Sequence, residues 1–294
     1  MKVIMHSFGT NQNFYLQSTF LIINLLQYRD EIDSINVITD KPHYYNRLSN
    51  YINIFAVDEH TLRVWAGDYN FVFRVKLKAI EMIIKHDKGD SPVLYLDVDT
   101  FIYQGFEVMK QELLSRKALM HNNEGKLSAC PTHSAARVWN GVKYKTLGGY
   151  TISKDDVMWN AGVIGIPTGS CDEIIDTAIM MCDDMCRLIP VNFLIEQFCV
   201  SVALQRKFEI QAASGCVGHY WSNRDAWTGL IAGFITESFM KNYTVEEDVR
   251  RIAEFDFGQI PIACIKTNTE IKLHRAISGY FRPKVLSTIE YRKK

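Results

Sequence analysis

The chain has 294 residues, of which 47% are hydrophobic, 22% charged and 12% aromatic. This is the composition of a globular protein that buries a large core, and it excludes a mostly disordered chain. Lys and Arg together number 33, and so do Asp and Glu. The chain therefore lacks the overall positive charge that attracts nucleic acid, and we expect no nucleic-acid partner.

The N-terminus and the cysteines bear on where the protein works. Residues 1–8 have the pattern of a short strand, and no basic segment precedes a long apolar stretch, so we expect no secretory signal. The apolar run 20–26 is interrupted by Asn24 and falls short of the roughly 20 residues that cross a bilayer. Seven cysteines, scattered from Cys130 to Cys264, form no disulfide framework. These features predict a cytoplasmic protein with reduced thiols and no transmembrane segment.

Runs rich in branched residues alternate with helical patterns along the chain. We expect strands at 2–5, 35–39, 52–57, 93–96 and 161–166, and helices at 14–28, 71–85, 173–187, 193–204 and 245–254. This alternation predicts an α/β fold with a Rossmann-like, mainly parallel sheet and helices on both faces. Segment 122–159 fits neither pattern, and its glycines and aromatic residues predict a long functional connection.

No repeat, low-complexity segment or flexible linker divides the chain. We therefore expect one domain, 1–228, with a C-terminal helical extension, 229–294, packed on it. The extension ends in a basic tail that contains Arg282, Lys284, Arg292, Lys293 and Lys294. Such a tail is compatible with peripheral contact with a membrane, although a solvated terminus is the simpler interpretation.

The most informative stretch is the apolar strand before residue 97, which ends in two acids one residue apart, Asp97 and Asp99. Ligands of open α/β sheets bind beyond the carboxyl ends of the strands. Alternate side chains share one face of a strand, so both carboxylates could approach one divalent cation that keeps positions open for phosphate oxygens. The alternative is that the two acids only end the strand and begin a turn.

The surrounding motifs occur in an order that is more specific than any one of them. They are FRVKL at 73–77, LYLDVD at 94–99, WNAGV at 159–163, EQ at 196–197 and HYW at 219–221. In this order the sequence resembles GT-A glycosyltransferases, especially the glycogenin-like and lipopolysaccharide-galactosyltransferase-like family 8 group. The resemblance covers about three quarters of the chain. It implies a GT-A type fold.

The resemblance implies a metal site made by Asp97, Asp99 and His219, with Asp97 also near the ribose of the donor. An imidazole beside carboxylates favours Mn²⁺ over Mg²⁺, because nitrogen ligands suit transition metals better. The resemblance also implies that Ser7 and Phe8 lie near the nucleotide base. Uridine is the family's usual base, but this segment departs from the small-residue pattern of the family.

Further donor contacts are implied at four positions. Arg74 would contact the phosphates or the sugar, and Lys78 lies one turn further on the same helix face; a solvated face is the alternative. Asn160 would bond sugar hydroxyls through its amide. Gly162 would let the backbone approach the ligand closely.

The resemblance also places an acid or amide near the anomeric carbon. Gln197 is our first choice for orientation or electrostatic help there, and Glu196 is the competing choice. The family's usual pair is Asp-Gln, so a Glu at 196 leaves the exact placement open.

The sequence therefore predicts a metal-dependent glycosyltransferase, a hexosyltransferase, that moves a sugar from a nucleotide-sugar donor such as UDP-sugar to a carbohydrate or lipid-linked acceptor. Retention of anomeric configuration is expected, although acids within 122–156 could supply the base that inversion needs. A haloacid-dehalogenase-like phosphatase also has paired acids, but Thr100 follows the second acid one residue too early for that signature. A GT-A-like protein that only binds nucleotide sugar is the third alternative.

Overall fold

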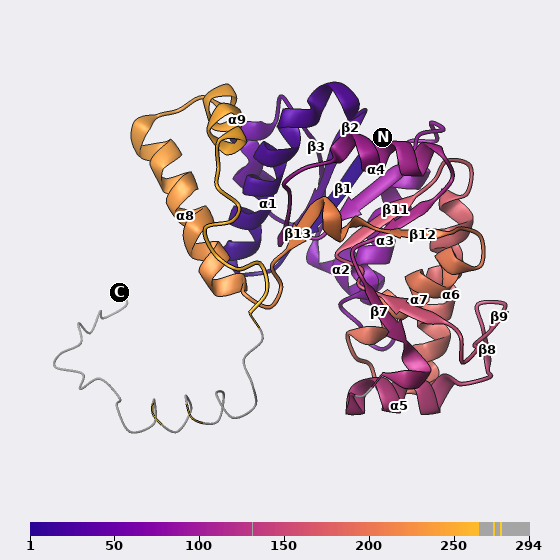
Figure 1. Cartoon of the computed structure of the whole chain (residues 1–294). Coiled ribbons are helices and arrows are strands. Elements are labelled where there is room, and N and C mark those ends of the chain that lie inside the picture. Colours follow the sequence, from indigo (N-terminus) through magenta and orange to yellow (C-terminus); the bar gives the residue numbers. More distant parts are fainter. Residues whose placement is uncertain (131, 265–272, 274–276, 278–294) are drawn as a thin grey trace, which may run out of the picture.

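The computed structural model describes residues 1–130, 132–264, 273 and 277 (Figure 1). Its centre is a seven-stranded sheet in the order β12-β6-β11-β4-β1-β2-β3. The strands are β1 (Lys2–Ser7), β2 (Ser34–Thr39), β3 (Asn53–Ala56), β4 (Val93–Leu96), β6 (Ala118–Met120), β11 (Val163–Ile166) and β12 (Ile210–Ala212). Neighbours are parallel except at β11, which runs antiparallel to β4 and β6. The predicted mainly parallel sheet is confirmed.

Helices cover both faces of this sheet (Figure 1). One face carries α1 (Gln12–Leu25), α4 (Phe106–Leu114), α8 (Arg224–Lys241) and α9 (Val245–Ala253), and the other carries α3 (Arg74–His86), α6 (Cys171–Leu188) and α7 (Leu194–Gln205). Alternation along β1 explains this division, because Val3 and Met5 join the core under α1 while Ile4 joins the core under α3. Helices on both faces are thus confirmed as well.

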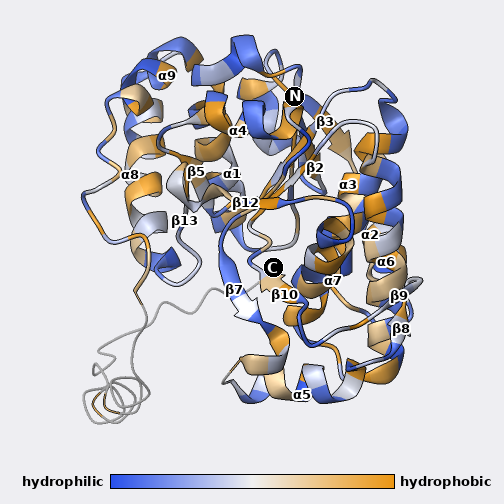
Figure 2. Cartoon of the chain, turned by 45° about the vertical axis from the view of Figure 1, so that its right-hand side comes forward, coloured by the Kyte–Doolittle hydropathy of each residue, from blue (hydrophilic) through white to orange (hydrophobic). Residues whose placement is uncertain are grey.

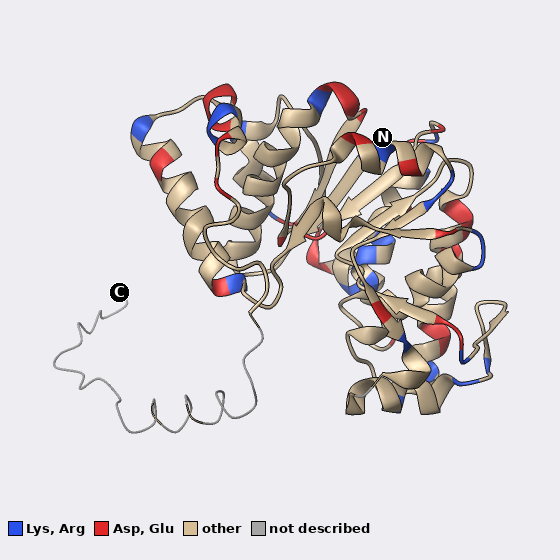
Figure 3. Cartoon of the chain, in the orientation of Figure 1, with Lys and Arg blue, Asp and Glu red and all other residues tan. Residues whose placement is uncertain are grey.

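All ten expected elements are present, with shifted ends. The expected helix at 14–28 ends at Leu25, and a 3₁₀ helix, η1 (Leu26–Glu31), continues the chain. Two further short helices, α2 (Glu59–Ala66) and the 3₁₀ helix η2 (Pro42–Leu48), fill connections that were not assigned. Basic and acidic residues are interspersed along the described part of the ribbon (Figure 3).

The expectation of an irregular connection at 122–159 is wrong. The segment holds β7 (Asn123–Lys126), the 3₁₀ helix η3 (Leu127–Ala129), α5 (His133–Val142), β8 (Thr146–Leu147), β9 (Tyr150–Thr151) and β10 (Val157–Trp159). β7 is hydrophilic throughout and its antiparallel partner β10 is hydrophobic (Figure 2), so neither shows the alternation that reveals a strand. The N-cap of α5 was also overlooked: the Thr132 hydroxyl accepts from Ala135 N at 3.2 Å.

The C-terminal part is described only as far as residue 264, apart from 273 and 277. α8 passes through the expected boundary after residue 228, and both α8 and α9 pack against α1. The division into 1–228 and 229–294 stays a prediction, and the basic tail lies outside the described residues. A membrane span needs a long apolar helix, and the described part of the chain contains none. The cytoplasmic location also stays a prediction.

Two short antiparallel strands connect the sheet to the helices on its α1 face. β5 (Thr100–Ile102) pairs with β13 (Val217–His219), so that Thr100 lies opposite His219. The fully buried amide of Asn24 in α1 holds β5: its Nδ2 donates to the Ile102 carbonyl at 2.9 Å, and its Oδ1 accepts from Ile102 N at 2.7 Å. The polar residue that interrupts the apolar run of α1 thus anchors β5.

We expect Asn24→Leu to lower the free energy of unfolding by about 2–4 kcal/mol, because it leaves the buried N–H and C=O of Ile102 unpaired. Urea denaturation measures the change. Asn13→Leu, at an exposed position of the same helix, is the matched control and should cost less than about 0.5 kcal/mol. Equal stability of the two variants would contradict the anchoring role of Asn24.

Candidate active site at the carboxyl end of the sheet

The three predicted metal ligands meet at one point. Asp97 and Asp99 follow β4, and His219 ends β13, which the pairing with β5 brings beside Asp99. One ligand atom of each lies within 4.8 Å of the others, and among the described residues no other group of three His, Cys, Asp or Glu meets as closely. Asp99 and His219 are buried, and Asp97 is partly exposed. The juxtaposition of the three side chains matches the prediction.

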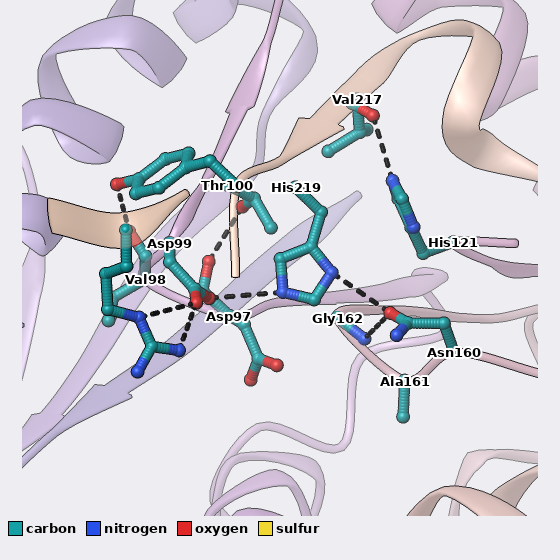
Figure 4. A network of polar contacts seen from close by, with 12 residues as sticks. Asp97, Val98, Asp99, Thr100, His121, Asn160, Ala161, Gly162, Val217 and His219 are labelled. Carbon is teal, nitrogen blue, oxygen red and sulfur yellow. Dashed lines mark hydrogen bonds and ion pairs between the residues drawn. The ribbon is translucent and has the colours of Figure 1, made fainter. Parts of the chain in front are cut away.

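Hydrogen bonds orient the imidazole of His219 toward Asp99 (Figure 4). Nδ1 lies 3.0 Å from Asn160 Oδ1, which also accepts from Gly162 N at 3.0 Å, while Nε2 faces Asp99 Oδ1 at 3.3 Å. Because Asn160 Oδ1 is an acceptor, Nδ1 carries the hydrogen, and Nε2 is the ring nitrogen that faces the carboxylate oxygen of Asp99. Nε2 can donate to this carboxylate when the ring is charged, and it would bind a cation when the ring is neutral, so the donor set fits a divalent metal.

Gly162 is required by the imidazole itself. A Cβ on this residue would lie 2.3 Å from the Cε1 and Nδ1 atoms of His219. The glycine therefore admits the histidine ring, and its predicted role in the approach of a ligand stays a prediction.

Glu124, on β7, extends the hydrogen-bonded chain and was missed from the sequence. Its Oε1 accepts from Asn160 Nδ2 at 3.1 Å, and its Oε2 accepts from Gln197 Nε2 at 2.9 Å. An ionised carboxylate only accepts, so it fixes both amides with their nitrogens toward it. This leaves Asn160 Oδ1 for His219. The only available signal was an acid within a segment that had no predicted structure.

Two cations that were given no role in the sequence interpretation lie beside the acids. Lys76 is buried, and its Nζ lies 3.0 Å from Asp97 Oδ1 and 3.1 Å from the Ala161 carbonyl. Arg224, at the start of α8, donates to Asp99 Oδ2 through Nε at 3.1 Å and also through Nη2. Burial alone would raise the pKa of Asp99, but contact with His219 and the charge of Arg224 hold it well below its ordinary value. Asp99 is therefore ionised.

Arg74 and Lys78 are not at this cluster. Arg74 donates to Asp183 through Nε at 2.6 Å and Nη2 at 2.9 Å, and Lys78 pairs with Glu81. Successive residues of a helix are about 100° apart, so Lys76 lies on the opposite side of α3 from both. The donor contacts expected of Arg74 and Lys78 stay predictions that these pairings do not favour.

Glu196 is buried behind Lys76, with Oε2 3.5 Å from Nζ and no hydrogen-bond partner for Oε1 among the described residues. Burial raises its pKa to about 7; Lys76 opposes this increase and Asp97 adds to it. Gln197, the next residue, instead reaches Glu124. The two candidates for the anomeric centre thus have different surroundings.

A cavity of about 430 Å³ opens beside the acids and has two kinds of wall. Charged side chains form one part, namely Lys76, Asp97, Asp99 and Arg224, and aromatic rings form another, namely His6, Phe8, Phe14, Phe73 and Tyr95. Ser7 also lines it, so the residues expected near the base share one cavity with the acid pair. Burial lowers the pKa of His6 to about 4, which leaves a neutral ring stacked on Phe8.

No protein-family model matches the chain, and no curated protein does. Solved structures resemble it distantly. The galactosyltransferase LgtC, in complex with donor and acceptor sugar analogues, is 10% identical, with 72% of this chain and 74% of LgtC covered and a TM-score of 0.48. Mouse xyloside xylosyltransferase 1 is 9% identical over 72% and 84% of the two chains, with a TM-score of 0.44. The bifunctional glycosyltransferase WbbM is 10% identical over 72% and 39%, with a TM-score of 0.44.

All three solved structures are described as glycosyltransferases, which is the class of enzyme that the sequence motifs indicate. The similarity is too distant to assign substrates or residue roles. The function proposed below therefore rests on the residues of this chain.

The position of Glu196 predicts a pH-dependent stability. Its pKa is raised from 4.5 to about 7 in the folded protein, so its stabilising contribution is complete below the lower value and is lost as the pH rises through the higher one. Glu196→Gln removes this loss. We expect the stability of the variant relative to wild type to rise between about pH 5 and about pH 8 by up to ~3 kcal/mol, at ~1.4 kcal/mol per pKa unit.

Urea denaturation at the two pH values measures this difference. Glu254→Gln, which replaces an exposed carboxyl, is the control. Its stability relative to wild type should be the same at both pH values. A Glu196→Gln effect that does not change with pH would contradict the ionisation described here.

Proposed function

We propose that this chain is a metal-dependent glycosyltransferase that takes a sugar from a nucleoside diphosphate donor, UDP-sugar, and transfers it to an acceptor hydroxyl of a carbohydrate or lipid-linked molecule. One observation carries the proposal: Asp97 and Asp99 line a cavity that also has cationic and aromatic side chains, and His219 meets the two acids. A phosphate-rich, flat ligand needs that combination.

Asp99 Oδ1 and His219 Nε2 would hold the ion, with Asp97 close by, because Asp99 Oδ2 is engaged by Arg224. A bound Mn²⁺ or Mg²⁺ would neutralise the charge of the diphosphate leaving group. The imidazole ligand favours Mn²⁺.

Arg224 has the geometry of a diphosphate-binding residue. Its side chain is 45% exposed and lines the cavity beside Asp99. A guanidinium donates to two oxygens at once, so it can bind a phosphate while remaining near the carboxylate. Lys76, in contrast, is enclosed by acceptors, and we propose that it holds Asp97 in place.

We propose that Asn160 and Gln197 contact the transferred sugar. Glu124 fixes both amides, and this leaves the Gln197 carbonyl oxygen to act at the anomeric centre. Glu196 is the less favoured choice because its carboxylate faces the buried Nζ of Lys76. The carboxylate of Glu124, the acid nearest to these amides within 122–156, is already engaged at both oxygens. This supports retention, since inversion requires a free base.

We expect UDP to bind in the presence of Mn²⁺, to bind at least about tenfold more weakly with EDTA, and to lose a similar factor in Asp99→Asn, because the ion joins the diphosphate to the protein. Isothermal titration measures each affinity. Asp225→Asn, at the exposed acid next to Arg224, should bind like wild type.

Slow Mn²⁺-dependent hydrolysis of a UDP-sugar would then separate an enzyme from a protein that only binds the donor. Failure of every nucleoside diphosphate to bind would overturn the proposal. Binding that survives both EDTA and Asp99→Asn would overturn the metal site.

The proposed stereochemistry is tested on the same hydrolysis. We expect the released sugar to appear first as the anomer of the donor, because both oxygens of Glu124, the acid beside the two amides, are already engaged and do not activate water on the opposite face. Proton NMR at early times distinguishes the anomers before mutarotation. First release of the opposite anomer would contradict retention and identify an inverting enzyme.

A further inference from the structure

Among the described residues, three buried side-chain oxygens have no hydrogen-bond partner: Gln17 Oε1, Glu31 Oε2 and Glu196 Oε1. Glu31 Oε2 faces Lys110 Nζ at 3.7 Å and does not line the cavity, and Glu196 lies next to the buried Lys76. Gln17 differs from both because it is part of the cavity wall. A buried acceptor without a partner is unfavourable, so such atoms are rare unless something binds them.

The amide of Gln17 reaches from α1 to α8. Its Nε2 donates to the hydroxyl of Thr228 in α8 at 2.8 Å, and the whole side chain is buried at 0% exposure. Oε1 is therefore the amide atom left for a ligand. An amide oxygen only accepts hydrogen bonds, so it cannot bind phosphate oxygens and requires an N–H or O–H group.

The surroundings of Gln17 indicate which part of a ligand supplies that group. Phe14 lies one turn earlier on α1 and lines the same cavity, as do the rings of Phe8 and Phe73. Flat rings suit a planar base, whereas the cations beside Asp97 and Asp99 suit phosphates. A nucleoside has both a planar base and hydrogen-bond donors, on its ring or on its ribose.

We propose that Gln17 Oε1 accepts a hydrogen bond from the nucleoside half of the donor and thereby determines which nucleotide the site selects. The inference rests on the function proposed above. In uridine two groups could donate: the ring N–H, which guanine shares and which cytosine and adenine lack, or a ribose hydroxyl. Gln17 would thus select for a hydrogen-bond donor group of the nucleoside and not for the diphosphate.

Titration of wild-type protein with Mn²⁺ and UDP, GDP, CDP, ADP, 2′-deoxy-UDP and 3′-deoxy-UDP tests this without any substitution. If Gln17 accepts from the ring N–H, UDP and GDP should bind at least about tenfold more tightly than CDP and ADP. If Gln17 accepts from a ribose hydroxyl, the deoxy analogue that lacks this hydroxyl should bind more weakly than UDP by a similar factor. Equal affinity for the whole series would overturn the proposal.

Gln17→Leu tests the residue itself. The variant should lose the preference of the wild type, so that the favoured and disfavoured nucleotides bind with similar affinity. Thr228→Ser is the matched control, because it changes the same contact between α1 and α8 but keeps the hydroxyl that accepts from Nε2; it should retain the preference. Gln17→Met offers a second apolar side chain if leucine packs badly.

The outcomes separate this inference from the proposed function. If wild type binds nucleoside diphosphates and Gln17→Leu keeps the full preference among them, Gln17 does not determine which nucleotide binds. The proposed enzymatic function then still stands. If wild type binds none of them, both proposals fail.

Discussion

His219 and Asp99 lie about a hundred residues apart in the sequence, and the short pairing of β5 with β13 holds them together. The rest of the candidate site depends on this contact. From His219 the hydrogen bonds continue through Asn160 and Glu124 to Gln197, so the residues around the acids and those expected near the sugar form one chain. Each link fixes the donor and acceptor atoms of the next, because the carboxylate at Glu124 can only accept.

Much of the fold follows from local sequence patterns. The strand before Asp97 is a continuous apolar run, as expected for a strand that is covered on both faces, and the helical periodicity of 71–85 and 173–187 reproduces α3 and α6. The acid pair could be recognised from the sequence for the same reason, because it directly follows this continuous apolar strand. The segment with β7 and β10 could not be predicted, because β7 is hydrophilic and its pairing with β10 depends on contacts between distant parts of the chain.

The residues that the sequence did not assign share a different property. Lys76 stands on an apolar helix face, Glu124 lies in an unassigned segment, and Gln17 is one amide within a largely apolar helix. The role of each residue depends on contacts with partners more than 20 residues away in the sequence. These partners are Asp97 for Lys76, Asn160 and Gln197 for Glu124, and Thr228 for Gln17. Spacing arguments favoured Arg74 and Lys78 because they share an accessible face. That face pairs with Asp183 and Glu81 instead.

The charges at the cavity balance before any ligand binds. Lys76 neutralises Asp97, and Arg224 neutralises Asp99, so two buried or partly buried acids persist in a region where an isolated carboxylate would be costly. A nucleoside diphosphate sugar and a divalent cation also carry charges that nearly cancel. A balanced site can therefore admit them together with little change in net charge, whereas either one alone would leave an excess of one sign in a poorly solvated place. Arg224, the more exposed of the two cations, is the one free to exchange a carboxylate contact for a phosphate contact, while Lys76 remains enclosed.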